Sequence, residues 1–131
     1  MTTTVLPATG HKTGLGDLSR ALQELHRHLL MYQADESFFT GSPLELYEVA
    51  TRDPAFAWLK PLQQAIVDLD MRRNDETPLS KTEARAFSKK LERFIAAKSG
   101  PFRDKLNAVF QSHPEAVWAV GAARKALADL N

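Results

Sequence analysis

Histidines have the widest range of chemistry in this 131-residue chain, because imidazole binds metals and haem and titrates near neutral pH. His26 and His28 stand two positions apart in a predicted helix, so their side chains diverge by about 200° and cannot share one metal ion. No Glu stands three residues before a helical histidine, which excludes the Glu-x-x-His pairs of di-iron bundles. We expect no metal or cofactor. The alternative is a haem or small ligand held by His26 or His28, since a single axial ligand needs no spacing.

A row of four cations at every fourth position is the second pattern of interest, and we call it the basic stripe: Lys81, Arg85, Lys89 and Arg93. Residues 1–80 hold seven basic and eleven acidic side chains and residues 81–131 hold ten and five, giving net charges of −4 and +5. Like charges at this spacing destabilise a helix by about 0.2–0.5 kcal/mol per pair, so we expect an offset. The candidates are solvent screening, an acidic partner, or acidic residues of the chain itself, such as Asp68, Asp70, Asp75 and Glu76.

Binding of an anion or nucleic acid by residues 81–93 is a third interpretation, and the sequence favours protein binding over it. The net charge of +1 falls short of the basic balance typical of nucleic-acid-binding domains. Phe87 and Phe94 follow the predicted core spacing, so no aromatic side chain alternates with the cations to stack on single strands. The segment 111–114, between the last two predicted helices, lacks the glycine common in a helix-turn-helix.

Aromatic side chains form a second candidate surface. The apolar residues between Phe56 and Leu62, Trp58 among them, exceed what one helix stripe can bury. Phe38 and Phe39 lie in the loop after the first predicted helix. These residues either belong to a core that encloses a helix on several sides or line a pocket or dimer face. We take Trp58, Phe38 and Phe39, together with the basic stripe, as the candidate interaction residues.

Catalysis has the least support in the sequence, and we assign no catalytic residue. The absence of cysteine excludes disulfides, zinc ribbons, iron–sulfur clusters and thiol nucleophiles. The chain contains neither the Gly-x-Ser-x-Gly elbow nor the glycine-rich phosphate and dinucleotide motifs. Asp68 and Asp70 stand two positions apart on a predicted helix, so their carboxylates diverge.

The elements that position these residues are helices, because apolar residues recur at steps of three and four throughout the chain. Two capping boxes, Ser42 with Glu45 and Ser80 with Glu83, mark helix starts. Pro61 predicts a kink or break within 57–61 of the third helix. We therefore predict an all-α, single-domain bundle of about six helices over residues 15–131, preceded by a mobile tail at 1–14. The predicted helices cover about 17–34, 43–51, 53–73, 80–99, 102–112 and 115–130.

The segment from Phe56 to Leu62 reads Phe-Ala-Trp-Leu-Lys-Pro-Leu and precedes an apolar helix. It resembles a segment of small uncharacterised bacterial proteins, which also share an opening like the leucines and histidine at 25–30. The resemblance covers about residues 18–75. It implies an all-helical fold and brings no activity or site with it.

The longest apolar run spans residues 116–123, well short of the roughly 20 residues of a transmembrane helix. The first residues lack a basic region followed by an apolar stretch, so we expect no leader and a cytoplasmic location. The most economical function is that of a non-catalytic helical protein that binds another protein, including a second copy of itself as a homodimer.

Overall fold

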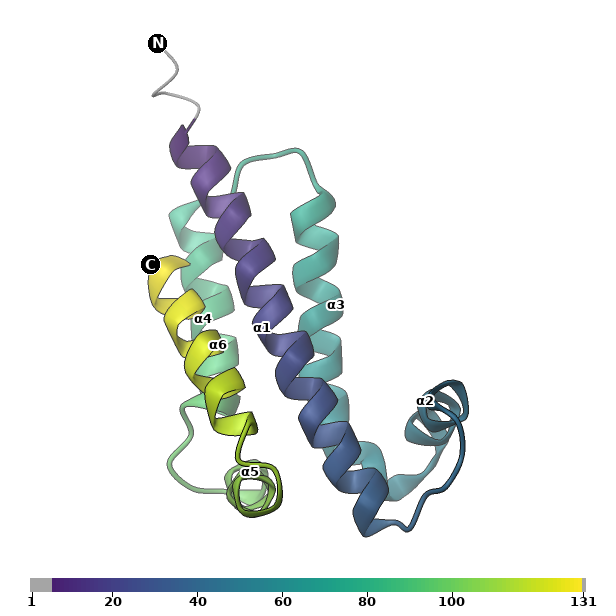
Figure 1. The fold of residues 1–131 in the computed structure, drawn as a ribbon. Helices are drawn as coiled ribbons and strands as arrows, with labels where there is room; N and C mark the ends of the chain where they lie inside the picture. The colour runs from purple at the N-terminus through teal and green to yellow at the C-terminus, as the bar shows by residue number, and fades with distance from the viewer. Residues whose placement is uncertain (1–5, 131) are drawn as a thin grey trace.

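The computed structural model describes the backbone of residues 6–130 and the side chains of residues 14–130. The described chain is helical between its turns and contains no strand, which confirms the predicted all-α class (Figure 1). Its helices are α1 (Leu6–Glu36), α2 (Pro43–Arg52), the 3-10 helix η2 (Pro54–Leu59), α3 (Lys60–Asn74), α4 (Lys81–Ile95), α5 (Pro101–Ser112) and α6 (Ala116–Leu130). Within residues 6–130, no helix is both long and apolar enough to cross a membrane.

Helix α1 is the helix on which most of the other helices pack. Its leucines at steps of three and four are completely buried: Leu15, Leu18, Leu22, Leu25 and Leu29. α6 and α3 pack along α1, α4 packs on α6, and α5 lies across the lower end in the view of Figure 1. α2 stands apart from the bundle and rests mainly on η2.

Helix α1 begins at Leu6, before the predicted start at residue 17. Gly16 and Asp17 suggested a helix start, but both lie inside the helix. A Cβ atom at Gly14 would lie 3.2 Å from Cδ2 of Leu130, so the glycine lets α1 approach the end of α6 closely. Residues 6–14 of the predicted tail are the first turns of α1, and residues 1–5 lie outside the described residues. The mobility of the tail stays a prediction.

Both predicted capping boxes are present. Ser42 Oγ accepts from the amide of Glu45 at 3.2 Å, and Glu45 Oε1 accepts from the amide of Ser42 at 3.1 Å. Ser80 and Glu83 repeat the arrangement at 3.1 and 3.3 Å. These bonds satisfy amides that a helix start leaves without partners, which fixes where α2 and α4 begin.

The predicted bend in the third helix is a break between two helices. η2 is tightly wound, and its first amides are capped by Asp53, whose Oδ1 accepts from the amide of Ala55 at 2.9 Å. Pro61 stands in the first turn of α3, where its missing amide proton costs nothing. Because the chain changes direction here, η2 buries Phe56 and Leu59 while α3 continues with its own apolar row.

The α1 leucine row sets the stability of the fold. We expect Leu22→Ala to lower the free energy of unfolding by about 2–5 kcal/mol, because it leaves a cavity in the centre of the core. The matched control is Leu44→Ala at a side chain that is 71% exposed, with an expected change within about 0.5 kcal/mol. Urea denaturation followed by circular dichroism measures both. Equal effects of the two substitutions would contradict the described packing.

Candidate functional site

The basic stripe lies on the solvent side of α4. All four of its side chains are exposed, whereas Ala84, Ser88, Leu91 and Ile95 of the same helix are buried. Arg85 and Lys89 line a shallow groove of about 300 Å³ together with Thr82 and Ala86, and we call it the α4 groove. Arg85 and Lys89 make part of its lining cationic, and the methyl group of Ala86, which we call the methyl floor, makes part of it apolar. The helix presents positive charge beside a small apolar surface.

The acidic residues of α3 that could have offset the stripe have other partners. Asp68 Oδ2 lies 3.0 Å from Nζ of Lys90, which is outside the stripe. Asp70 Oδ1 accepts from Ser19 Oγ at 2.6 Å and lies 3.4 Å from Nη1 of Arg73. Among the residues that the structure describes, no ion pair joins a stripe cation to a carboxylate within 4.0 Å.

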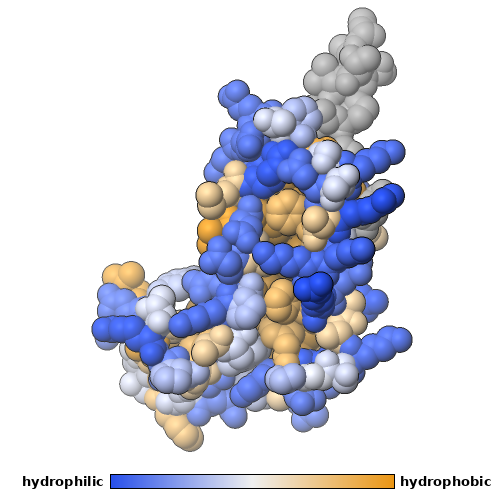
Figure 2. Space-filling view, turned by 180° about the vertical axis from the view of Figure 1, so that it is seen from behind, coloured by the Kyte–Doolittle hydropathy of each residue, from blue (hydrophilic) through white to orange (hydrophobic). Residues whose placement is uncertain are grey.

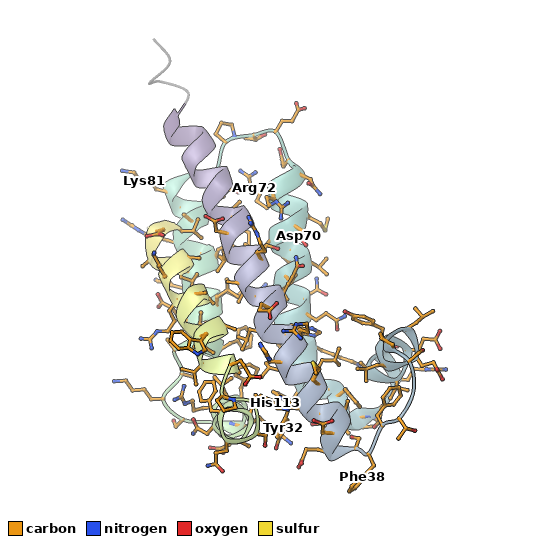
Figure 3. All side chains as sticks on the ribbon, in the orientation of Figure 1. Tyr32, Phe38, Asp70, Arg72, Lys81 and His113 are labelled. Atoms are coloured by element: carbon orange, nitrogen blue, oxygen red, sulfur yellow. The ribbon has the colours of Figure 1, made fainter. Side chains whose placement is uncertain are left out.

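Sequence reasoning missed the ion pair that fixes the start of α4. Arg72, at the end of α3, donates from Nε to Glu83 Oε2 at 2.7 Å and from Nη2 to Glu83 Oε1 at 3.1 Å. The same guanidinium donates to the carbonyls of Thr77 and Pro78 at 2.9 and 3.0 Å. Its side chain is only 13% exposed. Arg72, which Figure 3 labels, thus holds the turn between α3 and α4 together. No local sequence pattern predicts its pairing with Glu83.

Trp58 has a structural role and does not belong to an exposed surface. Its ring is half-buried, and Nε1 donates to Gln33 Oε1 of α1 at 2.8 Å. The ring centroid lies 5.8 Å from that of Phe102, and Lys105 Nζ lies 5.7 Å above the indole. These contacts join η2 to α1 and α5, so the indole fills a junction of three helices.

Phe38 lies at the other end of the molecule from Lys81, the first residue of the stripe (Figure 3). Phe38 is 89% exposed and has a left-handed φ of 56°, where the chain turns out of α1. Phe39 is half-buried, and both line a cleft of about 400 Å³ with Phe56. The structure therefore does not bring the predicted aromatic residues and the basic stripe into one site.

The two histidines are also separate. His26 lines a cleft of about 390 Å³ between α1, α2 and α3, beside Tyr47, Ile66 and Val67. Burial lowers the pKa of His26 below its usual 6.5, which keeps the imidazole neutral at pH 7. His28 is buried elsewhere on α1, with Nε2 at 3.5 Å from Glu24 Oε1. No group of three or more His, Cys, Asp or Glu among the described residues is placed to hold a metal ion.

Two exposed apolar features escaped the sequence analysis. α2 buries none of its residues, and Leu44 and Tyr47 are 71% and 56% exposed. Trp118 at the start of α6 is 81% exposed. Helical spacing could have revealed the exposed residues of α2. Leu46, Val49 and Ala50 fall on one side of the helix, which leaves Leu44 and Tyr47 outside that side. Nothing in the pattern of α6 singles out Trp118.

Comparisons with known protein families, with curated proteins and with solved structures find no match to this chain. The resemblance of the Phe56–Leu62 segment to small bacterial proteins stays a prediction. The assignment of residue roles therefore rests on the geometry of the chain itself.

The Arg72–Glu83 pair predicts a defined acid sensitivity. The Arg72 guanidinium and the Ser80 amide lower the pKa of Glu83 from 4.5 to about 2. Because the folded state lowers this pKa, the stabilisation is complete above about pH 4.5 and is lost as the pH falls from 4.5 towards 2. Glu83→Gln should therefore lower the melting temperature at pH 7 and flatten its decline over that range. Glu92→Gln, at an exposed position of the same helix, is the control, and equal pH profiles of the two variants would refute the pairing.

The burial of His26 in its cleft predicts a second loss of stability on acidification, at a higher pH than that of Glu83. Since burial lowers the pKa of His26, the unfolded chain binds more protons below pH 6.5, and stability falls as the pH drops through this value. We expect the His26 resonances to titrate below 6.5 in a two-dimensional NMR experiment. His26→Gln should weaken the loss of stability between pH 7 and about 5.5. A midpoint at or above 6.5 would show that the imidazole is not buried.

Proposed function

We propose that this chain is a non-catalytic protein that binds an acidic, partly apolar segment of a partner protein along the α4 groove. The observation that carries the proposal is the exposed basic stripe, which has no carboxylate partner among the described residues and borders an apolar floor. The proposal includes the cytoplasmic location expected from the sequence.

The energetics of α4 favour a partner with negative charge. The stripe contains three successive like-charge pairs at four-residue spacing, which together cost roughly 1 kcal/mol in an isolated helix. Salt screens this repulsion only in part at physiological ionic strength. Carboxylates placed between the cations would replace repulsion with attraction and would speed association through long-range steering.

A protein segment fits this face better than a nucleic acid. The two aromatic residues of α4, Phe87 and Phe94, are half-buried against the core, so they offer no platform on which a base could stack. The methyl floor at Ala86 suits an apolar side chain, which a phosphate backbone does not supply.

A small ligand held at His26 is the second candidate function. The cleft of about 390 Å³ is within the size range of ligand pockets, and its imidazole is neutral. Its two arginines, however, already pair with carboxylates of α1: Arg20 with Asp17 at 3.3 Å and Arg27 with Glu24. Both arginines of the cleft therefore have a carboxylate partner, whereas Arg85 and Lys89 of the α4 groove have none among the described residues.

The test is a titration of the full chain with a fluorescent amphipathic peptide that carries Glu and Leu on one helical side. We expect binding at about 0.1 M salt and its loss at about 1 M salt, where the screening length falls to about 3 Å. Arg85→Glu with Lys89→Glu should weaken binding by about tenfold or more, since each attraction becomes a repulsion. Fluorescence anisotropy measures the affinity.

The matched control is Arg20→Glu with Lys60→Glu, which changes the net charge equally at exposed positions away from α4. Unchanged binding by this control and unchanged melting of both double variants complete the expected result. Equal weakening in the two double variants would show that only net charge matters. Tighter binding of a random DNA duplex than of the peptide would overturn the proposal in favour of nucleic-acid binding.

A further inference from the structure

Helix α2 has an outward side on which none of the other described helices packs. Leu46, Val49 and Ala50 are half-buried and face the bundle. Leu44 and Glu48 lie on the opposite side of the helix and are exposed, and we call them the α2 outer face. Tyr47 is also exposed, but it borders the cleft around His26 and is not part of this face. In Figure 2, apolar side chains reach the surface of the part that protrudes to the lower left, where α2 lies when Figure 1 is turned round.

The surroundings of α2 are acidic. Residues 35–53 hold five acidic side chains and one basic side chain, a net charge of −4, which equals the entire net charge of residues 1–80. Residues 81–95 of α4 hold five basic and two acidic side chains, a net charge of +3. Glu48 has one ion pair, with Arg52 at 3.8 Å, and both side chains are more than 60% exposed. Such a pair contributes little and is easily exchanged.

The α2 outer face has the properties that the proposed function requires of a partner: a helix with carboxylate and apolar side chains on one side. We propose that the α4 groove binds the α2 outer face of a second copy of this chain. This inference rests on the proposed function and names its partner. Leu44 would meet the methyl floor at Ala86, and Glu48 would lie between the cations of Arg85 and Lys89.

The contact has to be between molecules. α2 and α4 lie on opposite sides of the bundle, so one chain cannot bring its own α2 to its own α4 (Figure 1). Two different surfaces meet in this contact, which makes it head-to-tail, and such contacts build rings or open chains. A helix of ten residues is about 15 Å long, which places the buried area at the low end of interface sizes, below about 1,200 Å². We therefore expect weak, reversible and salt-sensitive association.

A complementation experiment with full-length chains tests the head-to-tail geometry. One variant carries Arg85→Glu and Lys89→Glu and keeps its α2 outer face, and the other carries Leu44→Ala and Glu48→Gln and keeps its α4 groove. In sedimentation velocity at about 0.1 M salt, the unmodified chain should show species that grow with concentration. Each variant alone should stay monomeric. An equimolar mixture should form one-to-one pairs and nothing larger, because each pair has only blocked surfaces left.

The inference would be overturned if the unmodified chain stayed monomeric up to about 1 mM, a concentration at which even weak contacts are populated. It would also be overturned if either variant alone associated like the unmodified chain, or if the mixture formed no pairs. Arg85→Gln with Lys89→Gln gives a milder second variant, and all variants are checked for unchanged melting. If the chain stays monomeric while the acidic peptide still binds α4, only the second copy is wrong as partner. If the peptide also fails to bind, the proposed function fails with it.

Discussion

The row of buried leucines along α1 is the constraint on which the rest of the structure depends. These side chains are completely buried at steps of three and four, and both α3 and α6 pack along the helix that carries them. A helix covered on two sides in this way fixes the directions of its neighbours, because ridges of side chains pack into grooves only at certain angles. The exposed side of α4 is then decided by the side that it buries against α6.

Polar contacts add to the specificity of the register that the leucines set. Apolar contacts between helices are non-directional, whereas a hydrogen bond requires two particular atoms at a set distance. Ser19 to Asp70 ties α1 to α3 at 2.6 Å, and Trp58 to Gln33 ties η2 to α1 at 2.8 Å. Within the described side chains, no buried nitrogen or oxygen atom is without a hydrogen-bond partner. The bundle is thus specified by few polar contacts, each one satisfied.

Local patterns in the sequence predicted the helices, but they could not predict which residues far apart in the sequence are in contact. Apolar spacing and the two capping boxes located α2, α4 and the leucine row of α1, and Pro61 located the break before α3. The predicted tail included Gly14, because the role of this glycine, a close approach to Leu130, depends on a residue more than a hundred positions away. The exposure of the stripe followed from its period, but the pairing of Asp68 with Lys90 did not. Trp58 could not be assigned to core or surface until the break between η2 and α3 was known.

The separation of charge along the sequence becomes a separation in space. The 31 residues of α1 span roughly 46 Å. The acidic segment, residues 35–53, begins at the end of α1 where Phe38 lies. Lys81 lies at the other end of the bundle (Figure 3). At about 0.1 M salt, charges interact over roughly 10 Å, so the acidic segment contributes little to the potential around the start of the stripe. Salt or another molecule can relieve the repulsion within the stripe, and in the self-association proposed above that molecule is the acidic segment of a second copy.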